Sequence, residues 1–312
     1  MTMRIIEVAE QPRTLRVEHE QLVIRPRDET NGETVRAPLE DIAALVMAHP
    51  GVVVTHSVLA GISEAGGITV VCDRRNLPTG MVLPLITHHL QTERLSWQTT
   101  VKRPVQKQLW RQIVQAKIEA QGRALARLND SDQGLPLLAK RVRSGDPANV
   151  EAQASRRYWR ALFQDPEFRR DPEKEDQNIL LNYGYGVLRA LVARAACGAG
   201  LHPSIGIHHH NRYNPFCLAD DLMEPYRPLV DEEVARWTRE ERGPLDRLTR
   251  EAKAALISRC TLHYTVQGEA RSLFDILAKA AVSLVNVYAG NAKRLELPTI
   301  EPAESSSPTE TP

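Results

Sequence analysis

In the stretch Gly206-Ile-His-His-His-Asn-Arg-Tyr-Asn-Pro-Phe-Cys-Leu-Ala-Asp-Asp-Leu-Met-Glu-Pro-Tyr-Arg-Pro228, three consecutive histidines stand one short loop before a predicted helix. That helix carries Asp220, Asp221 and Glu224, so nitrogen and carboxylate donors lie close together along the chain. Carboxylates with at most one imidazole suit Mg²⁺ or Mn²⁺, which prefer hard oxygen ligands. The stretch therefore predicts part of a divalent-metal site, with three candidate histidines and three candidate acids.

Both halves of this stretch also have simpler interpretations. A run of three histidines is often only a polar loop, and acids three or four residues apart also form a solvated helix face. However, Gly206-Ile207 has the pattern of the end of a buried element, and Pro225 and Pro228 follow the acids directly. We therefore predict a short helix that is packed at its end.

The composition is that of a globular protein with a sizeable core. The chain has 312 residues, of which 42% are hydrophobic and 25% charged, and this length predicts two domains. Its four cysteines are widely spaced and form neither a zinc motif nor a redox pair, which favours a reduced, cytoplasmic location. The N-terminus does not resemble a signal peptide, and no apolar run is long enough to predict a membrane partner.

Charge is unevenly distributed along the chain. Residues 101–170 carry 15 basic and 7 acidic side chains, a net charge of +8, while residues 1–95 carry −3 and residues 171–312 carry −4. A basic segment beside an acidic metal-type cluster is typical of enzymes that act on nucleic acids, because phosphates need cationic partners. The alternative is a solvated basic helix face.

Residues 1–86 are predicted to form a small β-rich domain of sandwich or split-barrel character. Branched residues recur in short runs, and turn signals such as Asn31-Gly32 and Gly66-Gly67 separate the runs. A helical insert is expected near Val58–Ala65. The predicted strands are Arg4–Val8, Thr14–Val17, Leu22–Arg25, Thr34–Ala37, Ile42–Met47, Val52–Thr55, Ile68–Cys72 and Met81–Leu83.

After residue 86 the pattern becomes helical. Residues 87–103 are expected to be a linker or first helix, residues 104–297 an all-α catalytic domain, and residues 298–312 a disordered tail rich in Ser, Thr, Pro and Glu. The fold class is thus α+β. The predicted helices are Val105–Leu128, Val150–Phe163, a helix from Asp176 or Asn178 to Gly198 or Gly200, Leu245–Arg259 and Arg271–Tyr288.

One acid outside the opening stretch is also a candidate. Asn149 is a plausible N-cap, and Glu151 then lies in the first turn of a helix, where the helix dipole favours a carboxylate. Taken alone, Glu151 is best interpreted as a capping acid. However, Ala152 and Ala154 are small enough to admit another helix or a ligand close to it.

Three motifs resemble those of a known family, the CRISPR-associated spacer-acquisition integrases built on the first Cas protein. An acid followed by small residues and an aromatic pair stands at Val150-Glu151 to Tyr158-Trp159. Gly-x-x-His stands at Gly206–His209, and Asp-Leu-Met-Glu-Pro-x-Arg-Pro stands at Asp221–Pro228. The resemblance extends to about Leu297. The short length, Asn182-Tyr-Gly-Tyr-Gly186 and Asn211-Arg-Tyr-Asn214 resemble the subgroup of type II systems.

The resemblance implies a site and a cofactor. The metal ligands and catalytic residues carry over as Glu151, His209 and Glu224, with Mg²⁺ or Mn²⁺ as the cofactor. Asp221 and Arg227 are auxiliary. The triple histidine departs from the family pattern, so His208 or His210 could be the ligand in place of His209.

The resemblance also implies a function and partners. The expected enzyme is a metal-dependent DNA endonuclease and integrase, which inserts new spacers into a CRISPR array when a 3′-hydroxyl attacks a phosphodiester. Its expected partners are double-stranded DNA, comprising the prespacer and the CRISPR repeat and leader, and a second copy of the chain. A dimer of the small second Cas protein, completing a heterohexamer, and the effector nuclease are further expected partners. The alternatives are a nuclease that only hydrolyses DNA and a non-catalytic DNA-binding scaffold.

Overall fold

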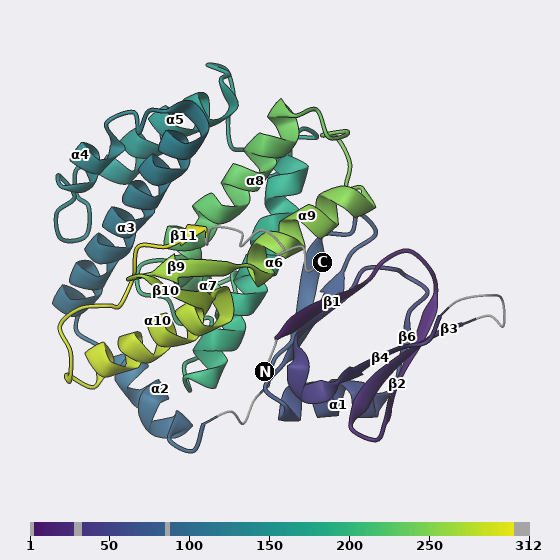
Figure 1. Cartoon of the computed structure of the whole chain (residues 1–312). Coiled ribbons are helices and arrows are strands. Elements are labelled where there is room, and N and C mark those ends of the chain that lie inside the picture. Colours follow the sequence, from purple (N-terminus) through teal and green to yellow (C-terminus); the bar gives the residue numbers. More distant parts are fainter. Residues whose placement is uncertain (1–2, 28–32, 85–87, 303–312) are drawn as a thin grey trace, which may run out of the picture.

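The computed structural model describes residues 3–27, 33–84 and 88–302 (Figure 1). Its N-terminal part contains two four-stranded sheets. One has the order β1 (Arg4–Val8), β5 (Ile42–Met47), β7 (Ile68–Cys72) and β8 (Pro78–Val82), with β1, β5 and β7 parallel and β8 antiparallel. The other has the order β4 (Val35–Pro38), β3 (Gln21–Pro26), β2 (Arg13–Glu18) and β6 (Val53–Val54).

A small apolar core joins the two sheets and helix α1 (His56–Glu64), which follows β6. Leu15 and Leu22 come from one sheet, Leu45 from the other and Ile62 from α1, and all four are fully buried. The predicted sandwich character is therefore confirmed. The bounds predicted for β1, β5 and β7 agree with those in the structure, whereas the predicted turn at residues 31–32 lies outside the described residues.

Strand β5 is buried on both faces. Leu45 belongs to the sandwich core, whereas Ala44 and Val46 belong to the larger core that the helices form. Successive side chains of a strand point to opposite faces, so this mixed sheet contributes to both cores. The structure does not test the domain boundaries that the sequence predicts at residues 86, 103 and 297, which stay predictions.

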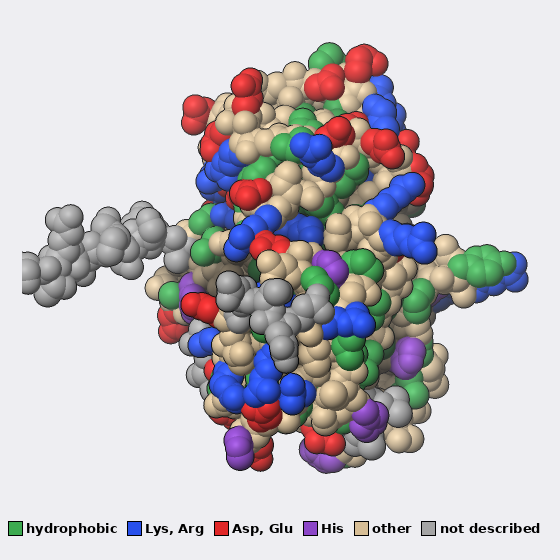
Figure 2. Space-filling model, turned by 90° about the vertical axis from the view of Figure 1, so that its right-hand side faces the viewer, with side chains coloured by type: hydrophobic (Ala, Val, Ile, Leu, Met, Phe, Trp, Pro, Cys, Tyr) green, Lys and Arg blue, Asp and Glu red, His purple; other side chains and the backbone are tan. Residues whose placement is uncertain are grey.

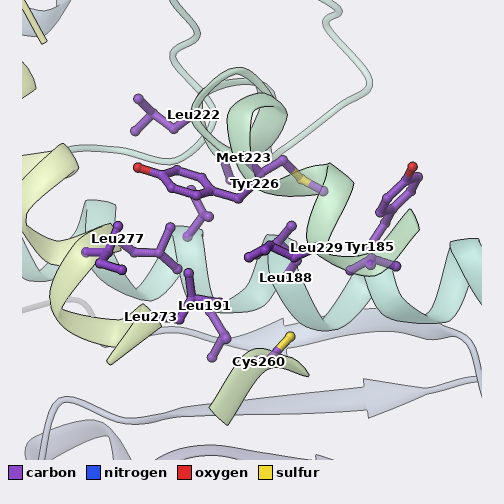
Figure 3. Packing of buried hydrophobic residues seen from close by; sticks show 14 of the residues in the cluster. Tyr185, Leu188, Leu191, Leu222, Met223, Tyr226, Leu229, Cys260, Leu273 and Leu277 are labelled. Atoms are coloured by element: carbon purple, nitrogen blue, oxygen red, sulfur yellow. The ribbon is translucent and has the colours of Figure 1, made fainter. Parts of the chain in front are cut away.

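Helix α6 (Asn178–Gly198) lies at the centre of the helical part, where it contacts α7, α8, α9 and α10. Figure 3 shows its Leu188 and Leu191 among Leu273 and Leu277 of α10 and Leu229 of α8. The α+β class is confirmed. The other helices of the described residues after β8 are α2 (Gln91–Thr100), α3 (Arg103–Asn129), α4 (Leu135–Ala139), α5 (Val150–Phe163), α7 (Cys217–Met223), η2 (Glu224–Tyr226), α8 (Arg227–Arg239), α9 (Arg250–Thr261) and α10 (Leu273–Tyr288), and the short η1 (Leu39–Asp41) lies between β4 and β5.

Helix α8 is an element that the sequence pattern did not predict. The sequence predicts that Pro225 and Pro228 end the preceding helix, but in the structure they lie in the first turns of η2 and α8. Proline is tolerated there because the first helical N–H groups have no intrahelical partner. A Cβ on Gly184 would lie 2.4 Å from Cγ1 of Val230, so this glycine lets α6 and α8 pack closely.

The C-terminal part adds a small antiparallel sheet to the region that was expected to be all-α. Its order is β10 (Glu269–Ser272), β9 (His263–Val266) and β11 (Glu301–Pro302). These strands are too short for their period to stand out in the sequence. The segment expected to be disordered from residue 298 thus begins with ordered residues, because Ile300 is buried and Glu301 pairs with Arg127 at 2.6 Å. Residues 303–312 lie outside the described part.

Among the helices of the described segments, none combines the length and apolar character that crossing a membrane requires.

Candidate metal centre and adjoining pocket

Helix α5 presents Glu151 from its first turn. The side chain of Asn149 accepts a hydrogen bond from the Ala152 N–H, which confirms Asn149 as the N-cap. Asp146 accepts from the N–H groups of Val150 and Glu151 at 3.0 and 2.9 Å, so two side chains fix this helix start. The carboxylate of Glu151 is 26% exposed and lines a pocket rather than capping its own helix.

Asp221 fixes the conformation of the loop that carries the three histidines. This buried carboxylate accepts hydrogen bonds from the N–H groups of Ile207 at 2.7 Å, His208 at 2.8 Å and His209 at 3.3 Å, and it also contacts Nδ1 of His209. A Cβ on Gly206 would lie 2.3 Å from the His209 carbonyl oxygen, so the turn requires glycine. Asp221, predicted as auxiliary, therefore orients the loop and its oxygens are already engaged.

The three histidines have different environments. The hydrogen bond to Asp221 raises the pKa of His209, and contact through Nδ1 leaves Nε2 on the other side of a ring that is 48% exposed. His208 instead stacks on buried Trp110 with ring centroids 4.2 Å apart, and burial lowers its pKa. His210 is exposed. The Asp–His arrangement that commonly orients a metal-binding imidazole is thus formed at His209.

Glu224 is the most deeply buried of the three predicted ligands. It is 6% exposed, Oε1 accepts a hydrogen bond from Arg227 Nε at 2.9 Å, and Oε2 lies 2.6 Å from Lys117 Nζ. Burial raises the pKa of Glu224, but the charges of Arg227 and Lys117 outweigh it and lower this pKa to about 2. Arg227 thus forms an ion pair, and it also lies over the Tyr185 ring.

Lys117 of α3 joins the two glutamates. Its Nζ lies 2.6 Å from Oε1 of Glu151 and 2.6 Å from Oε2 of Glu224. The charge pattern of residues 101–170 predicts phosphate contacts or a solvated basic helix face, but the Lys117 side chain is only 12% exposed. Its position four residues after Ile113 and three after Val114, both buried, is the signal that could have placed it on the buried stripe.

The remaining acids near the site serve other contacts. Asp220, a candidate from its spacing, accepts from Arg189 Nε and Asn214 Nδ2, both at 2.7 Å. Asp231, which no motif indicated, accepts a hydrogen bond from the Tyr158 hydroxyl at 2.9 Å and another from Tyr185. Burial raises the pKa of Asp231 to about 7.

A pocket of about 540 Å³ opens beside the two glutamates. Five of its six basic side chains come from residues 101–170, so the fold brings the basic segment next to the acids as the charge pattern indicated. On the side that lies at the right of Figure 1, by contrast, Lys and Arg side chains are interspersed with Asp and Glu (Figure 2). The charged lining residues are Lys117, Glu151, Arg156, Arg160, Arg169, Arg170, Glu224, Arg227 and Asp231.

The donor types of the three candidate side chains suit a hard divalent cation, although these side chains do not converge on one point. Within residues 3–27, 33–84 and 88–302, no three His, Cys, Asp or Glu side chains are close enough together to hold a metal ion. However, a cation already lies between Glu151 and Glu224, namely the Lys117 ammonium. Oε2 of Glu224 is buried and has no hydrogen bond despite that contact. Two carboxylates and one imidazole therefore fit Mg²⁺ or Mn²⁺ chemically.

The model of the family described as CRISPR associated protein Cas1 matches residues 6–265. The chain belongs to the Cas1 family. The CRISPR-associated endonuclease Cas1 of Neisseria meningitidis is 39% identical over 294 residues, which cover 92% of this chain and 93% of the relative. The resemblance inferred from the three motifs is thereby confirmed.

Two solved structures share the fold of this Cas1 chain. A casposase bound to integration product has a TM-score of 0.76 at 18% identity and covers 95% of this chain and 93% of its own. A chain of a Cas6-RT-Cas1–Cas2 complex has a TM-score of 0.73 at 19% identity, over 97% of this chain and 36% of its own. This Cas1 chain is thus a member of a CRISPR-associated family whose Neisseria meningitidis relative is named an endonuclease, and it shares its fold with a casposase.

Proposed function

We propose that this Cas1 chain is a metal-dependent DNA endonuclease and integrase, which inserts new spacers into a CRISPR array by transesterification. The observation that carries the proposal is the pair Glu151 and Glu224, held on one cation at the edge of an arginine-lined pocket. Carboxylates hold a divalent cation, and arginines hold the phosphates of its nucleic-acid substrate. Family membership and the likeness to an integrase support the same reaction class.

Glu151, His209 and Glu224 would hold the Mg²⁺ or Mn²⁺ ion. When bound, the ion would polarise the scissile phosphate and lower the pKa of the attacking 3′-hydroxyl. Nε2 of His209 is the free ring nitrogen, because Nδ1 contacts Asp221. Asp221 orients the ring without being a ligand itself, as a carboxylate behind a metal-binding histidine commonly does.

The basic residues of the pocket position the DNA. Arg156 and Arg160 are exposed on α5, five and nine residues beyond Glu151, where they would contact phosphates without reading bases. In the reaction, the 3′-oxygen of the incoming strand forms a new bond to phosphorus as the bond to the leaving 3′-oxygen at the repeat boundary breaks. The number of phosphodiester bonds is conserved, so the step needs no external energy source.

The proposed assembly contains two copies of this chain on each side of a dimer of the small second Cas protein. Its DNA partners are the prespacer and the CRISPR repeat and leader. The Cas6-RT-Cas1–Cas2 complex supports the pairing with the second Cas protein, since one of its chains shares this fold. The effector nuclease is a further proposed partner, and the proposed location is the cytoplasm.

A strand-transfer assay tests the proposal. The purified chain and the small second Cas protein are incubated with Mn²⁺, a supercoiled CRISPR plasmid and a short labelled duplex, and we expect label joined to the plasmid. Glu151→Gln and Glu224→Gln should abolish joining, whereas Glu64→Gln, on the exposed face of α1, should retain it. Nicking without joined product would instead identify a hydrolytic nuclease. If the protein is folded and binds DNA but gives neither nicked nor joined product, the assay would identify a non-catalytic scaffold.

A further inference from the structure

Lys117 occupies an unusual position for a lysine. It lies on the buried stripe of α3, and its Nζ is 2.6 Å from a carboxylate oxygen of Glu151 and from one of Glu224. Burial alone would lower its pKa, but the charges of Glu224 and Glu151 outweigh burial and raise it, so the amine stays protonated. One ammonium thus contacts two carboxylates and reduces the repulsion between them.

The two contacts of Lys117 differ in kind. Nζ donates a hydrogen bond to Glu151, whereas Oε2 of Glu224 has the charge contact without hydrogen-bond geometry. A contact that depends on charge rather than direction can be made equally well by another cation. Glu224 also keeps a second partner, since Arg227 donates to Oε1 at 2.9 Å. Departure of the ammonium would therefore leave Glu224 partly compensated.

The pocket provides space into which the Lys117 ammonium can move. Lys117 is among the residues that line the pocket of about 540 Å³ beside the two glutamates. A lysine carries its charge on a flexible four-carbon stem, so Nζ can move several ångströms while the helix stays in place. The space it would enter is lined by arginines, which indicates that this region receives phosphates.

We propose that Lys117 holds the metal position between Glu151 and Glu224 in the metal-free protein and leaves it for the pocket when a divalent cation binds. This inference rests on the proposed function, because it requires the glutamates to be metal ligands. Lys117 is then a positioning residue, which keeps two like charges at a usable separation before the metal arrives. Its displaced ammonium would also face the phosphates of bound DNA.

Chemical labelling of the wild-type protein tests the exchange directly. Acetic anhydride modifies free amines, and mass spectrometry reports the modification of each lysine with and without saturating Mn²⁺. We expect labelling of Lys117 to rise several-fold with Mn²⁺. Labelling of Lys253, whose side chain is 6% exposed against 12% for Lys117 and which pairs with Glu7 outside the pocket lining, should not change. Unchanged labelling of Lys117 at saturating Mn²⁺ would overturn the proposal.

A matched pair of variants gives a second test that does not depend on activity. Lys117→Met removes the competing cation, and we expect the dissociation constant for Mn²⁺, measured by electron paramagnetic resonance, to fall about tenfold or more, because the competent state becomes fully populated. Lys117→Arg keeps the charge and should stay within about threefold of wild type on the same reasoning. An unchanged or weaker affinity in folded Lys117→Met protein contradicts the exchange.

Failure of the exchange can be told apart from failure of the metal site. If Glu151→Gln and Glu224→Gln leave Mn²⁺ binding as in the wild type, the metal site and the proposed function both fail. If those two variants lose Mn²⁺ binding while labelling of Lys117 in the wild type is the same with and without Mn²⁺, the metal site is supported and only the exchange is wrong.

Discussion

Nδ1 of His209 contacts Oδ1 of Asp221, a carboxylate with no exposed surface whose other oxygen accepts three backbone N–H groups of the same loop. One side chain therefore sets both the path of the loop and the orientation of the ring. A carboxylate with this many donors has little capacity left for a metal ion. Asp221 is thus better described as the support of His209 than as a fourth ligand.

Asp221→Asn should destabilise the protein and weaken metal binding. The neutral amide presents two donors to a site that contains only donors, so we expect a loss of about 3 kcal/mol in the free energy of unfolding. The Mn²⁺ affinity should fall about tenfold or more, as for other residues that support a metal ligand. Urea denaturation and metal titration measure the two effects. Asp220→Asn is the control, since its partner Arg189 is one-third exposed and can be hydrated.

Metal binding should depend on pH through His209. The pKa of His209 is raised above its usual value of 6.5, and a protonated imidazole cannot bind a metal. Mn²⁺ affinity should therefore fall as the pH decreases through this raised pKa, already above pH 6.5. The His209–Asp221 pair has the opposite sign for stability, because its contribution is fully present below pH 6.5 and is lost as the pH rises through the folded pKa.

The comparison of two histidine variants checks the assignment. His209→Gln should remove most of this pH dependence together with most of the affinity, whereas His208→Gln should keep both. Equal effects of the two substitutions would mean that the loop register differs from the one described.

Replacing Glu224 should cost more stability than replacing Glu151. Glu224→Gln leaves Arg227 and Lys117 as buried cations with reduced compensation, and breaking such a pair costs about 3–5 kcal/mol. Glu151 is 26% exposed, so water can replace part of its contact in Glu151→Gln. Urea denaturation of the metal-free variants measures the difference. Comparable losses in the free energy of unfolding would show that the two carboxylates contribute equally to stability.

Asp231 should make the stability depend on pH in a different window. Burial raises its pKa from 3.8 to about 7, so between these values the folded state holds a proton that the unfolded state has lost. The free energy of unfolding should therefore decrease as the pH rises from about 4 to about 7. Asp231→Asn should lack this component, and exposed Asp246→Asn should behave as the wild type. Parallel profiles for wild type and Asp231→Asn would contradict the buried pKa.

Truncation should separate the ordered part of the C-terminal segment from the rest. A chain ending at Leu297 loses buried Ile300 and the Glu301–Arg127 ion pair, and we expect it to be about 2 kcal/mol less stable. A chain ending at Pro302 keeps both and should unfold as the full-length protein does. Thermal denaturation of the three lengths is sufficient. Equal melting temperatures for both truncated chains would show that β11 contributes nothing.

Local patterns were enough for the elements that carry strong periodic or capping signals. Helix α5 begins and ends where predicted, since Asn149 caps it through a side-chain hydrogen bond. Helix α9 begins at Arg250, five residues later than predicted, because Thr249 is its N-cap. Helix α8 and the strands β9 to β11 escaped prediction, since proline at a helix start resembles a helix end and strands of two to four residues show no period.

By itself, the sequence determined the family, through three motifs whose order and spacing do not depend on how the chain folds. It also named Glu151, His209 and Glu224 as the candidate ligands. Only the tertiary structure decided that Asp221 supports His209, that Asp220 pairs with Arg189 and that Lys117 lies between the two glutamates. The reason is physical: a motif fixes neighbours along the chain, whereas the charge partners of these side chains lie 12 to 107 positions away and meet them only on folding.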